Sequence, residues 1–147
     1  MITLHHKKLI IGSFVLACAC ARPRSTLEYL TPYGPPTRPF SPAVRVGDLL
    51  YLSGQIGTDS TGKVVAGGIN AETRQALENI KDVLKRTGSS MDRVVKCTVF
   101  MADMSEWATM NEIYVTFFPV HKPARSAFGA TGLALNARVE IECIAAS

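Results

Sequence analysis

The sequence predicts an α+β fold in which one mixed β-sheet carries two helices on one face, in the order β-β-α-β-α-β-β. Three observations support this fold. Short runs rich in branched and aromatic residues alternate with two longer segments of helical period. The 147 residues suit one domain with an ordinary hydrophobic core. A content of 47% hydrophobic and 19% charged residues is typical of a globular chain.

The first two strands are expected at Ala43–Val46 and Leu49–Ser53, because the turn pair Gly47-Asp48 between two such runs indicates a hairpin. The second strand ends in Ser53-Gly54-Gln55-Ile56-Gly57. Gly54 allows a backbone or a ligand to approach closely. The Ser53 hydroxyl either donates to a ligand at this point or bonds to its own backbone.

The first helix is expected from an N-cap at Asn70 to about Thr87, with Gly88 as the residue that ends it. One apolar stripe runs along this segment. It comprises Ala76, Leu77, Ile80, Val83 and Leu84.

The second helix is expected to begin at a cap provided by Asp103 or Ser105 and to run to about Phe118. Its buried side chains are predicted to be Trp107, Met110, Tyr114 and Phe117. Asn111 lies beside this apolar stripe, where an asparagine serves as a hydrogen-bonding partner in the packing or as a ligand contact.

Three further strands, Arg93–Met101, Ala124–Phe128 and Ala137–Ala145, complete the sheet. Along the first of these, Cys97, Val99 and Met101 share one side, and Val94, Thr98 and Phe100 share the other. Neither side suits full exposure to water. Since two helices cover only one face, an uncovered apolar face predicts contacts between subunits and therefore a homo-oligomer.

Arg125 is the first candidate for chemistry. It stands in Lys122-Pro123-Ala124-Arg125-Ser126-Ala127-Phe128, a short strand-like run with no acidic neighbour in the local sequence. A guanidinium is always charged and its fork of donors matches a carboxylate, so Arg125 is a candidate for holding an anionic small molecule. The alternative is an arginine at a strand edge that reaches solvent or pairs with a distant acid.

The last strand carries the second candidate group. With a period of two residues, Glu140 and Glu142 share a face with Arg138 and Ile144. Two carboxylates on one face of a half-buried strand favour a raised pKa for one of them, which suits a general acid or base. The alternative is a solvated strand face on which Arg138 pairs with the acids.

Residues 1–21 have the three parts of an export signal: Lys7 and Lys8, an apolar run, and small residues. Val15-Leu16-Ala17-Cys18 resembles a bacterial lipobox, so lipidated Cys18 could attach the protein to a membrane outside the cytoplasm. Cleavage after Ala19 or Ala21, or a misassigned start and a cytoplasmic protein, are the alternatives. Residues 22–39 are rich in proline and predict an extended linker, which places the domain at residues 40–147.

Charge argues against nucleic acid as a partner. From Ser41 onward eleven basic residues face eleven acidic ones, so the net charge of +4 belongs to the first forty residues and not to the domain. No cysteine and histidine spacing indicates zinc, and no metal site is predicted. Cys97 and Cys143 are the cysteines of the body, and their pairing is left open.

Together these segments resemble the RidA family, also called YjgF or L-PSP, over about residues 38 to 146. The matching motifs are Ser53-Gly54-Gln55-Ile56-Gly57, Gln75-Ala76-Leu77-Glu78-Asn79, Val94–Phe100, Met110-Asn111-Glu112-Ile113-Tyr114, Pro123-Ala124-Arg125-Ser126 and Val139–Ala145. The resemblance implies a chorismate-mutase-like fold and a homotrimer with its sites in clefts between subunits.

The resemblance also implies hydrolysis of reactive 2-imino and 2-enamino acids to 2-oxo acids and ammonia. Arg125 would hold the substrate carboxylate, and Glu142 would orient or activate the water. The substrate-binding cleft would also contain Ser53, Gly54, Phe40, Asn111 and Ser126. No cofactor is expected, because a protonated imine is already an electrophile and needs only positioning and proton transfer.

The sequence departs from the family's Gly-Pro-Tyr-Ser-Gln pattern, which here is Arg38-Pro39-Phe40-Ser41-Pro42. Phe40 keeps the aromatic ring and lacks the phenolic hydroxyl. With the export-like leader, this change supports a second hypothesis. The chain would then form a non-catalytic trimer that binds a small carboxylate outside the cytoplasm.

Overall fold

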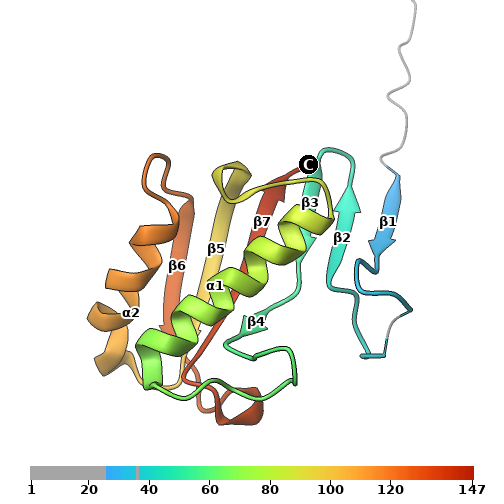
Figure 1. The fold of residues 1–147 in the computed structure, drawn as a ribbon. Coiled ribbons are helices and arrows are strands. Elements are labelled where there is room, and N and C mark those ends of the chain that lie inside the picture. The colour runs from blue at the N-terminus through green and yellow to red at the C-terminus, as the bar shows by residue number, and fades with distance from the viewer. Residues whose placement is uncertain (1–25, 36) are drawn as a thin grey trace, which may run out of the picture.

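The structure, a computed structural model, describes residues 26–35 and 37–147. They form one layer of β-sheet and one layer of helices (Figure 1). The sheet runs in the order β1-β2-β3-β7-β5-β6, and β4 pairs with β7 beyond β3. Only β5 and β6 are parallel, so the sheet is mixed as predicted. The strands are β1 (Leu27–Leu30), β2 (Ala43–Val46), β3 (Leu49–Leu52), β4 (Gln55–Ile56), β5 (Val94–Met101), β6 (Ala124–Gly129) and β7 (Val139–Ala146).

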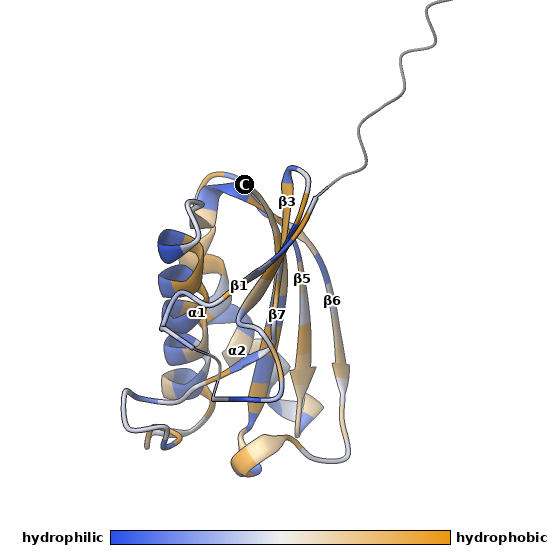
Figure 2. Cartoon of the chain, turned by 90° about the vertical axis from the view of Figure 1, so that its right-hand side faces the viewer, coloured by the Kyte–Doolittle hydropathy of each residue, from blue (hydrophilic) through white to orange (hydrophobic). Residues whose placement is uncertain are grey.

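Helices α1 (Gly68–Arg86) and α2 (Trp107–Tyr114) lie on the same face of this sheet, as expected (Figure 2). We call this the covered face, and the opposite one the open face. Short 3₁₀ turns flank the helices and strands. They span Met91–Arg93, Met104–Glu106, Val115–Phe117 and Ala134–Asn136.

The two ends of α1 show what its local sequence determines. Gly88 adopts a φ of +84°, and the amides of Gly88 and Ser89 donate to the carbonyls of Lys85 and Leu84. This is the Schellman arrangement, and the predicted end of the helix is confirmed. The helix begins at Gly68, two residues before Asn70, because Gly67 and Gly68 take positive φ values that lead the chain into the first turn.

The core lies between the covered face and the helices. The α1 stripe packs against β5 and β7, whose residues Cys97, Val99, Ile141 and Cys143 are almost fully buried. The segment after β4 approaches α1 so closely that a Cβ at Gly57 would lie 2.6 Å from Glu72 Cα. The buried Glu72 carboxylate accepts a bond from the Arg138 amide at 2.7 Å, which joins α1 to the start of β7.

The structure corrects the prediction of a linker over residues 22–39. Leu27–Leu30 within that range form β1, which pairs antiparallel with all four residues of β2. The described sheet therefore begins before residue 40. The proline content of the segment favours an extended spacer, but no proline falls inside these four residues, so pairing with the edge of β2 remains open to them.

Two predicted orientations are also wrong. A β-bulge between Val94 and Lys96 leaves Val95 exposed and turns Val94 to the covered face, away from Thr98 and Phe100. Trp107, predicted to be buried, is 40% exposed because it opens α2 at the rim of the helix layer.

The predicted export signal and lipobox at Cys18 lie outside the described residues. Within residues 26–35 and 37–147, no helix has the length and apolar character needed to cross a membrane.

Candidate active site

Arg125 lies in β6, the edge strand, and its side chain is on the covered face under α2. Its Cα partner on β5 is Cys97, which faces the helices. The Arg125 Nη1 donates to Asn111 Oδ1 at 2.9 Å, and the guanidinium lies over the Tyr114 and Trp107 rings, 4.5 and 5.7 Å from their centroids. Asn111 thus orients the arginine, and the aromatic faces favour its charge.

No carboxylate pairs with Arg125 among the residues that the structure describes. Arg138 offers a contrast, because its guanidinium is paired with Glu106 at 2.6 Å. Arg125 instead holds a neutral amide and two aromatic rings, which leaves donors of its fork for an anionic ligand.

The Tyr114 hydroxyl adds a second polar group beside Arg125. It is buried and has no hydrogen-bond partner within the described part of the chain. Burial raises the Tyr114 pKa to about 12, although the nearby Arg125 charge acts in the opposite direction. The hydroxyl therefore stays protonated at neutral pH.

Glu140 lies on the open face of β7, packed against Gly54. A Cβ at Gly54 would collide with the Glu140 carboxylate, so the side chain of Glu140 occupies the space that only a glycine leaves. Burial raises the Glu140 pKa above its usual value, and the charge of Glu142 raises it further. This is the behaviour that the pair of carboxylates predicts, and Glu140 is the member affected.

Glu142, the acid predicted to act on water, is exposed on the same face. It lines a small cavity of about 200 Å³ together with Lys96, Thr98 and Tyr51. Ser126 is also on the open face, in register with Thr98, and so points away from Arg125, its neighbour in sequence. Arg138 does not pair with either acid of β7, since it is engaged by Glu106.

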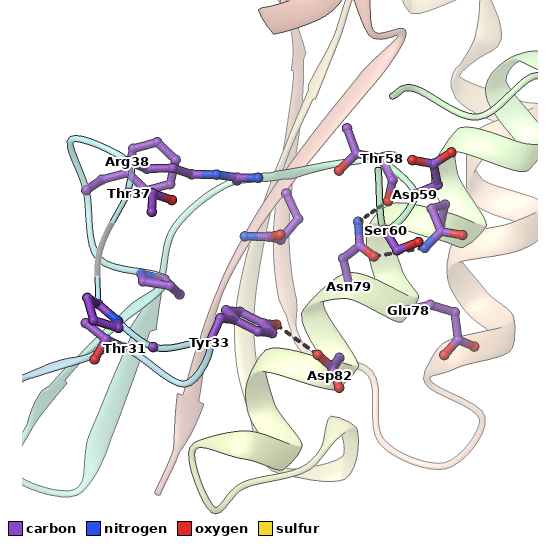
Figure 3. Close-up of a pocket in the computed structure, with 16 residues that line it drawn as sticks. Thr31, Tyr33, Thr37, Arg38, Thr58, Asp59, Ser60, Glu78, Asn79 and Asp82 are labelled. Atoms are coloured by element: carbon purple, nitrogen blue, oxygen red, sulfur yellow. Dashed lines mark hydrogen bonds between the residues drawn. The ribbon is translucent and has the colours of Figure 1, made fainter. Parts of the chain in front are cut away.

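Phe40 lies in the segment that precedes β2, and Ser53 directly follows β3. The Ser53 hydroxyl donates to the Ser41 carbonyl at 2.6 Å, and the Ser53 amide donates to the Pro42 carbonyl at 3.0 Å. Phe40 is 44% exposed and lines a larger cavity of about 660 Å³ between this segment and α1 (Figure 3). Gln55 lines the same cavity.

The predicted site residues therefore fall into two groups. Arg125 and Asn111 form one group on the covered face, and Ser53, Gly54, Glu140, Glu142 and Ser126 lie at the open face or beside it. β5 separates β6 from β7, which sets Arg125 about 10 Å from the two glutamates across the sheet as well as on its opposite side. A single chain does not bring Arg125 to either glutamate.

Cys97 and Cys143 form a disulfide across β5 and β7. They face each other in register, with a Cα–Cα distance of 4.1 Å, and Arg125 continues the same row on β6. The disulfide thereby ties the strand that carries Glu140 and Glu142 to the strand beside Arg125. Within the described ranges, histidine, cysteine and acidic side chains form no group suited to a metal ion.

Comparison with known proteins agrees with this fold and these motifs. A family model described as Endoribonuclease L-PSP matches residues 33–147. The chain is 47% identical over 108 residues to the 2-iminobutanoate/2-iminopropanoate deaminase of Mus musculus, covering 73% of this chain and 80% of that protein.

Two solved structures are also similar. A yeast protein, YEO7, is 40% identical with a TM-score of 0.77, covering 83% of this chain and 99% of that one. The TdcF protein of E. coli, solved with bound serine, is 32% identical with a TM-score of 0.73, covering 81% of this chain and 97% of that one.

Proposed function

The chain belongs to the RidA, or L-PSP, family, and on this basis we propose that it hydrolyses reactive 2-imino and 2-enamino acids to 2-oxo acids and ammonia. The observation that carries the proposal is Arg125, a half-buried arginine oriented by Asn111 and not paired with any described carboxylate. A 2-imino acid carries a carboxylate next to its imine carbon, so the group that binds it also positions the reacting atom.

The reaction needs a water molecule and one group that moves protons. Water adds to the carbon of the protonated imine, and the electrons of the C=N bond move to nitrogen. One proton then passes from the added oxygen to that nitrogen, and the carbinolamine loses ammonia as its C=O bond forms and its hydroxyl proton passes to the acid–base group. No redox step occurs, and no cofactor is required by this balance.

We assign the proton transfers to Glu140, in place of Glu142. The pKa of Glu140 is raised toward the operating pH, and a carboxyl with such a pKa can both accept and donate a proton. Glu142 remains part of the site as the neighbouring charge that helps to raise the Glu140 pKa. Ser53, Gly54 and Phe40 would border the same cleft, with Gly54 leaving room for the Glu140 carboxylate.

The complete site would form between copies of the chain, in a homotrimer. Arg125 and Glu140 lie on opposite faces, so the arginine of one copy would meet the acid of the next. The open face supports such assembly, because Tyr51 and Phe128 are 44% and 47% exposed there. Burial of these rings between copies would also exclude bulk solvent from the site.

The primary test is the rate at which the full-length protein removes 2-iminopropanoate generated in situ by an amino-acid oxidase. Wild-type protein should accelerate the loss, and Arg125→Ala should lower kcat/KM about ten- to a hundredfold, because a charge-assisted hydrogen bond is lost. Arg74→Ala, an exposed arginine on α1, is the matched control and should retain activity. Equal rates with and without wild-type protein would refute the proposal.

Mixed oligomers test where the site lies. Arg125→Ala and Glu140→Gln chains, each nearly inactive alone, would be co-expressed with different tags and the hybrid purified. If one copy supplies the arginine and the next the acid, each purified hybrid trimer has about one third of its sites intact and activity returns. A site within one chain gives no recovery.

The lack of a hydroxyl at Phe40 favours a second candidate, a trimer that binds a small carboxylate without turning it over. Calorimetric binding of pyruvate that depends on Arg125, together with no effect on imine lifetime, would support this role.

The chain is also proposed to work outside the cytoplasm, on a membrane if Cys18 is lipidated. The leader pattern of residues 1–21 supports export, and the Cys97–Cys143 disulfide suits an oxidising compartment. The N-terminus and mass of the mature protein would test this. An uncleaved chain in the cytoplasmic fraction would contradict it.

A further inference from the structure

The larger cavity lies apart from Arg125 and has its own arrangement of charge. Its volume is about 660 Å³, within the range of roughly 300–1,000 Å³ that small-molecule sites occupy. One wall is the N-terminal strap, by which we mean the described residues of 31–42 that follow β1. The opposite wall combines α1 with residues 58–60, which follow β4.

Charges of opposite sign face each other across this cavity. Figure 3 shows Arg38 on the strap, directed across the cavity, and Asp59, Glu78 and Asp82 on the opposite side. Arg38 forms no ion pair or side-chain hydrogen bond with any residue in the described ranges, and its guanidinium carbon lies over the Phe40 ring, 5.8 Å from the centroid. Its donors are therefore available to an anionic group.

The carboxylates differ in how far they are already used. Asp82 accepts from the Tyr33 hydroxyl at 2.9 Å and pairs with Arg86 at 2.7 Å, which closes one end of the cavity. Among the described residues, Glu78 pairs only with Lys81, which donates to both of its carboxylate oxygens in an exposed contact of a kind that contributes little. Asp59 accepts its bonds from Thr61 and Lys63 through one oxygen, Oδ1. Glu78 and the second oxygen of Asp59 remain for a cation.

The positions at which this chain departs from the family pattern gather on the same wall. Arg38, Phe40 and Pro42 all differ from the Gly-Pro-Tyr-Ser-Gln pattern, and all three line the cavity. The changes add a cation, remove a hydroxyl and remove an amide. A ligand specific to this chain is thus expected here, in a cavity that meets the proposed substrate cleft at Phe40.

We propose that the cavity between the N-terminal strap and α1 binds a short zwitterionic peptide. Its carboxylate pairs with Arg38, and its ammonium group is held by Glu78 and Asp59. The side-chain oxygens of Gln55 and Gln75, which line the cavity and accept no bond from the described residues, are suited to the peptide N–H groups between these ends, whereas Asn79 is already bonded to Ile56, Thr58 and Gln75. The volume exceeds the needs of a single amino acid, and separated charges require a ligand with two ends.

The test is calorimetric titration of the full-length protein with tri-alanine, N-acetyl-tri-alanine and tri-alanine amide at millimolar concentration. Tri-alanine should bind, and each blocked peptide should bind about tenfold more weakly or worse, since each has lost one charge-assisted contact. Absence of tri-alanine binding, or equal binding of the three peptides, overturns the proposal.

Variants assign the two ends. Arg38→Gln should weaken the binding of tri-alanine about tenfold, and tri-alanine amide should then bind as well as tri-alanine. The double variant Asp59→Asn, Glu78→Gln should remove the penalty for the N-acetyl peptide. Arg74→Gln, which changes the same charge outside the cavity, should bind as wild type. If Arg74→Gln lost as much affinity for tri-alanine as Arg38→Gln does, the effect would come from the net charge of the protein, and the assignment would be overturned.

Imine hydrolysis, measured on the same variants, separates this site from the proposed active site. Arg38→Gln should leave it unchanged, and Arg125→Ala should leave tri-alanine binding unchanged. Peptide binding lost in Arg125→Ala and kept in Arg38→Gln would place the peptide at the active site and overturn the inference. Absence of imine hydrolysis in the wild type would refute the proposed function and leave the binding result standing.

Discussion

The covered and open faces of the sheet differ in the charge that they carry. On the covered face, Arg125 is held by the Asn111 amide and by aromatic rings, without a carboxylate among the described residues. On the open face, Glu140 and Glu142 stand side by side without an arginine, again within the described ranges. The nearby Arg138–Glu106 pair, at 2.6 Å, shows that the fold does form close ion pairs.

In the composite site proposed above, the separation of Arg125 from the glutamates would serve assembly. Each group keeps binding capacity that the described residues of its own chain do not satisfy, and the two are complementary in sign. The covered face and its disulfide supply rigidity, whereas the open face supplies the surface and the acid. The predictions below test this division.

The largest expected effect comes from Glu140→Gln, which removes the proposed proton carrier of the open face. General acid–base groups contribute about 10²- to 10⁴-fold, so kcat for imine hydrolysis should fall by at least a hundredfold. Glu142→Gln is the matched control and should cost much less, while lowering the pKa in the pH–rate profile by removing a neighbouring charge. Similar losses in both variants would show that the acids share the role.

The second prediction concerns the disulfide of the covered face. The double variant Cys97→Ala, Cys143→Ala should lower the free energy of unfolding by about 2–4 kcal/mol, because the unfolded chain loses a cross-link between residues 46 apart. Urea denaturation with and without dithiothreitol provides the measurement. Reductant should destabilise the wild type and leave the double variant unchanged. A wild-type midpoint that does not move in reductant would argue against the bond.

The third prediction concerns a variant that introduces a carboxylate next to Arg125 on the covered face. Asn111→Asp places an acid at the atom that now accepts from Arg125 Nη1 at 2.9 Å. The new ion pair should compete with substrate and raise KM about tenfold or more, with a smaller change in kcat. Asn111→Ala, which only removes the orienting bond, should raise KM less. A stronger effect of the alanine variant would mean that orientation matters more than charge.

Local sequence predicted much of this architecture, and the failures have a common cause. Gly88 ends α1 because its positive φ is a local property, and Arg125 was identifiable because its neighbours lack acids. Glu142 stays a prediction, and our preference for Glu140 rests on a contact that is not local, because Gly54, just before β4, reaches Glu140 on β7. β1 and the bulge at Val95 likewise depend on partner strands. The role of Asn111 required the packing of α2 over β6.

The smallest expected effect is the dependence of stability on the titration of Glu140. Its pKa is raised in the folded chain by burial and by Glu142, so the native state binds more protons than the unfolded state above the ordinary pKa of 4.5. Stability from this group is therefore complete below that pH and declines as pH rises through the raised value. Glu140→Gln should flatten this decline in stability, measured as urea midpoints from pH 4 to pH 8. Glu78→Gln, which changes an exposed glutamate on α1, should leave the decline intact. An unchanged slope in Glu140→Gln would mean that the carboxylate is hydrated in the assembled protein, and the open face would then not be the dry surface that the proposed site needs.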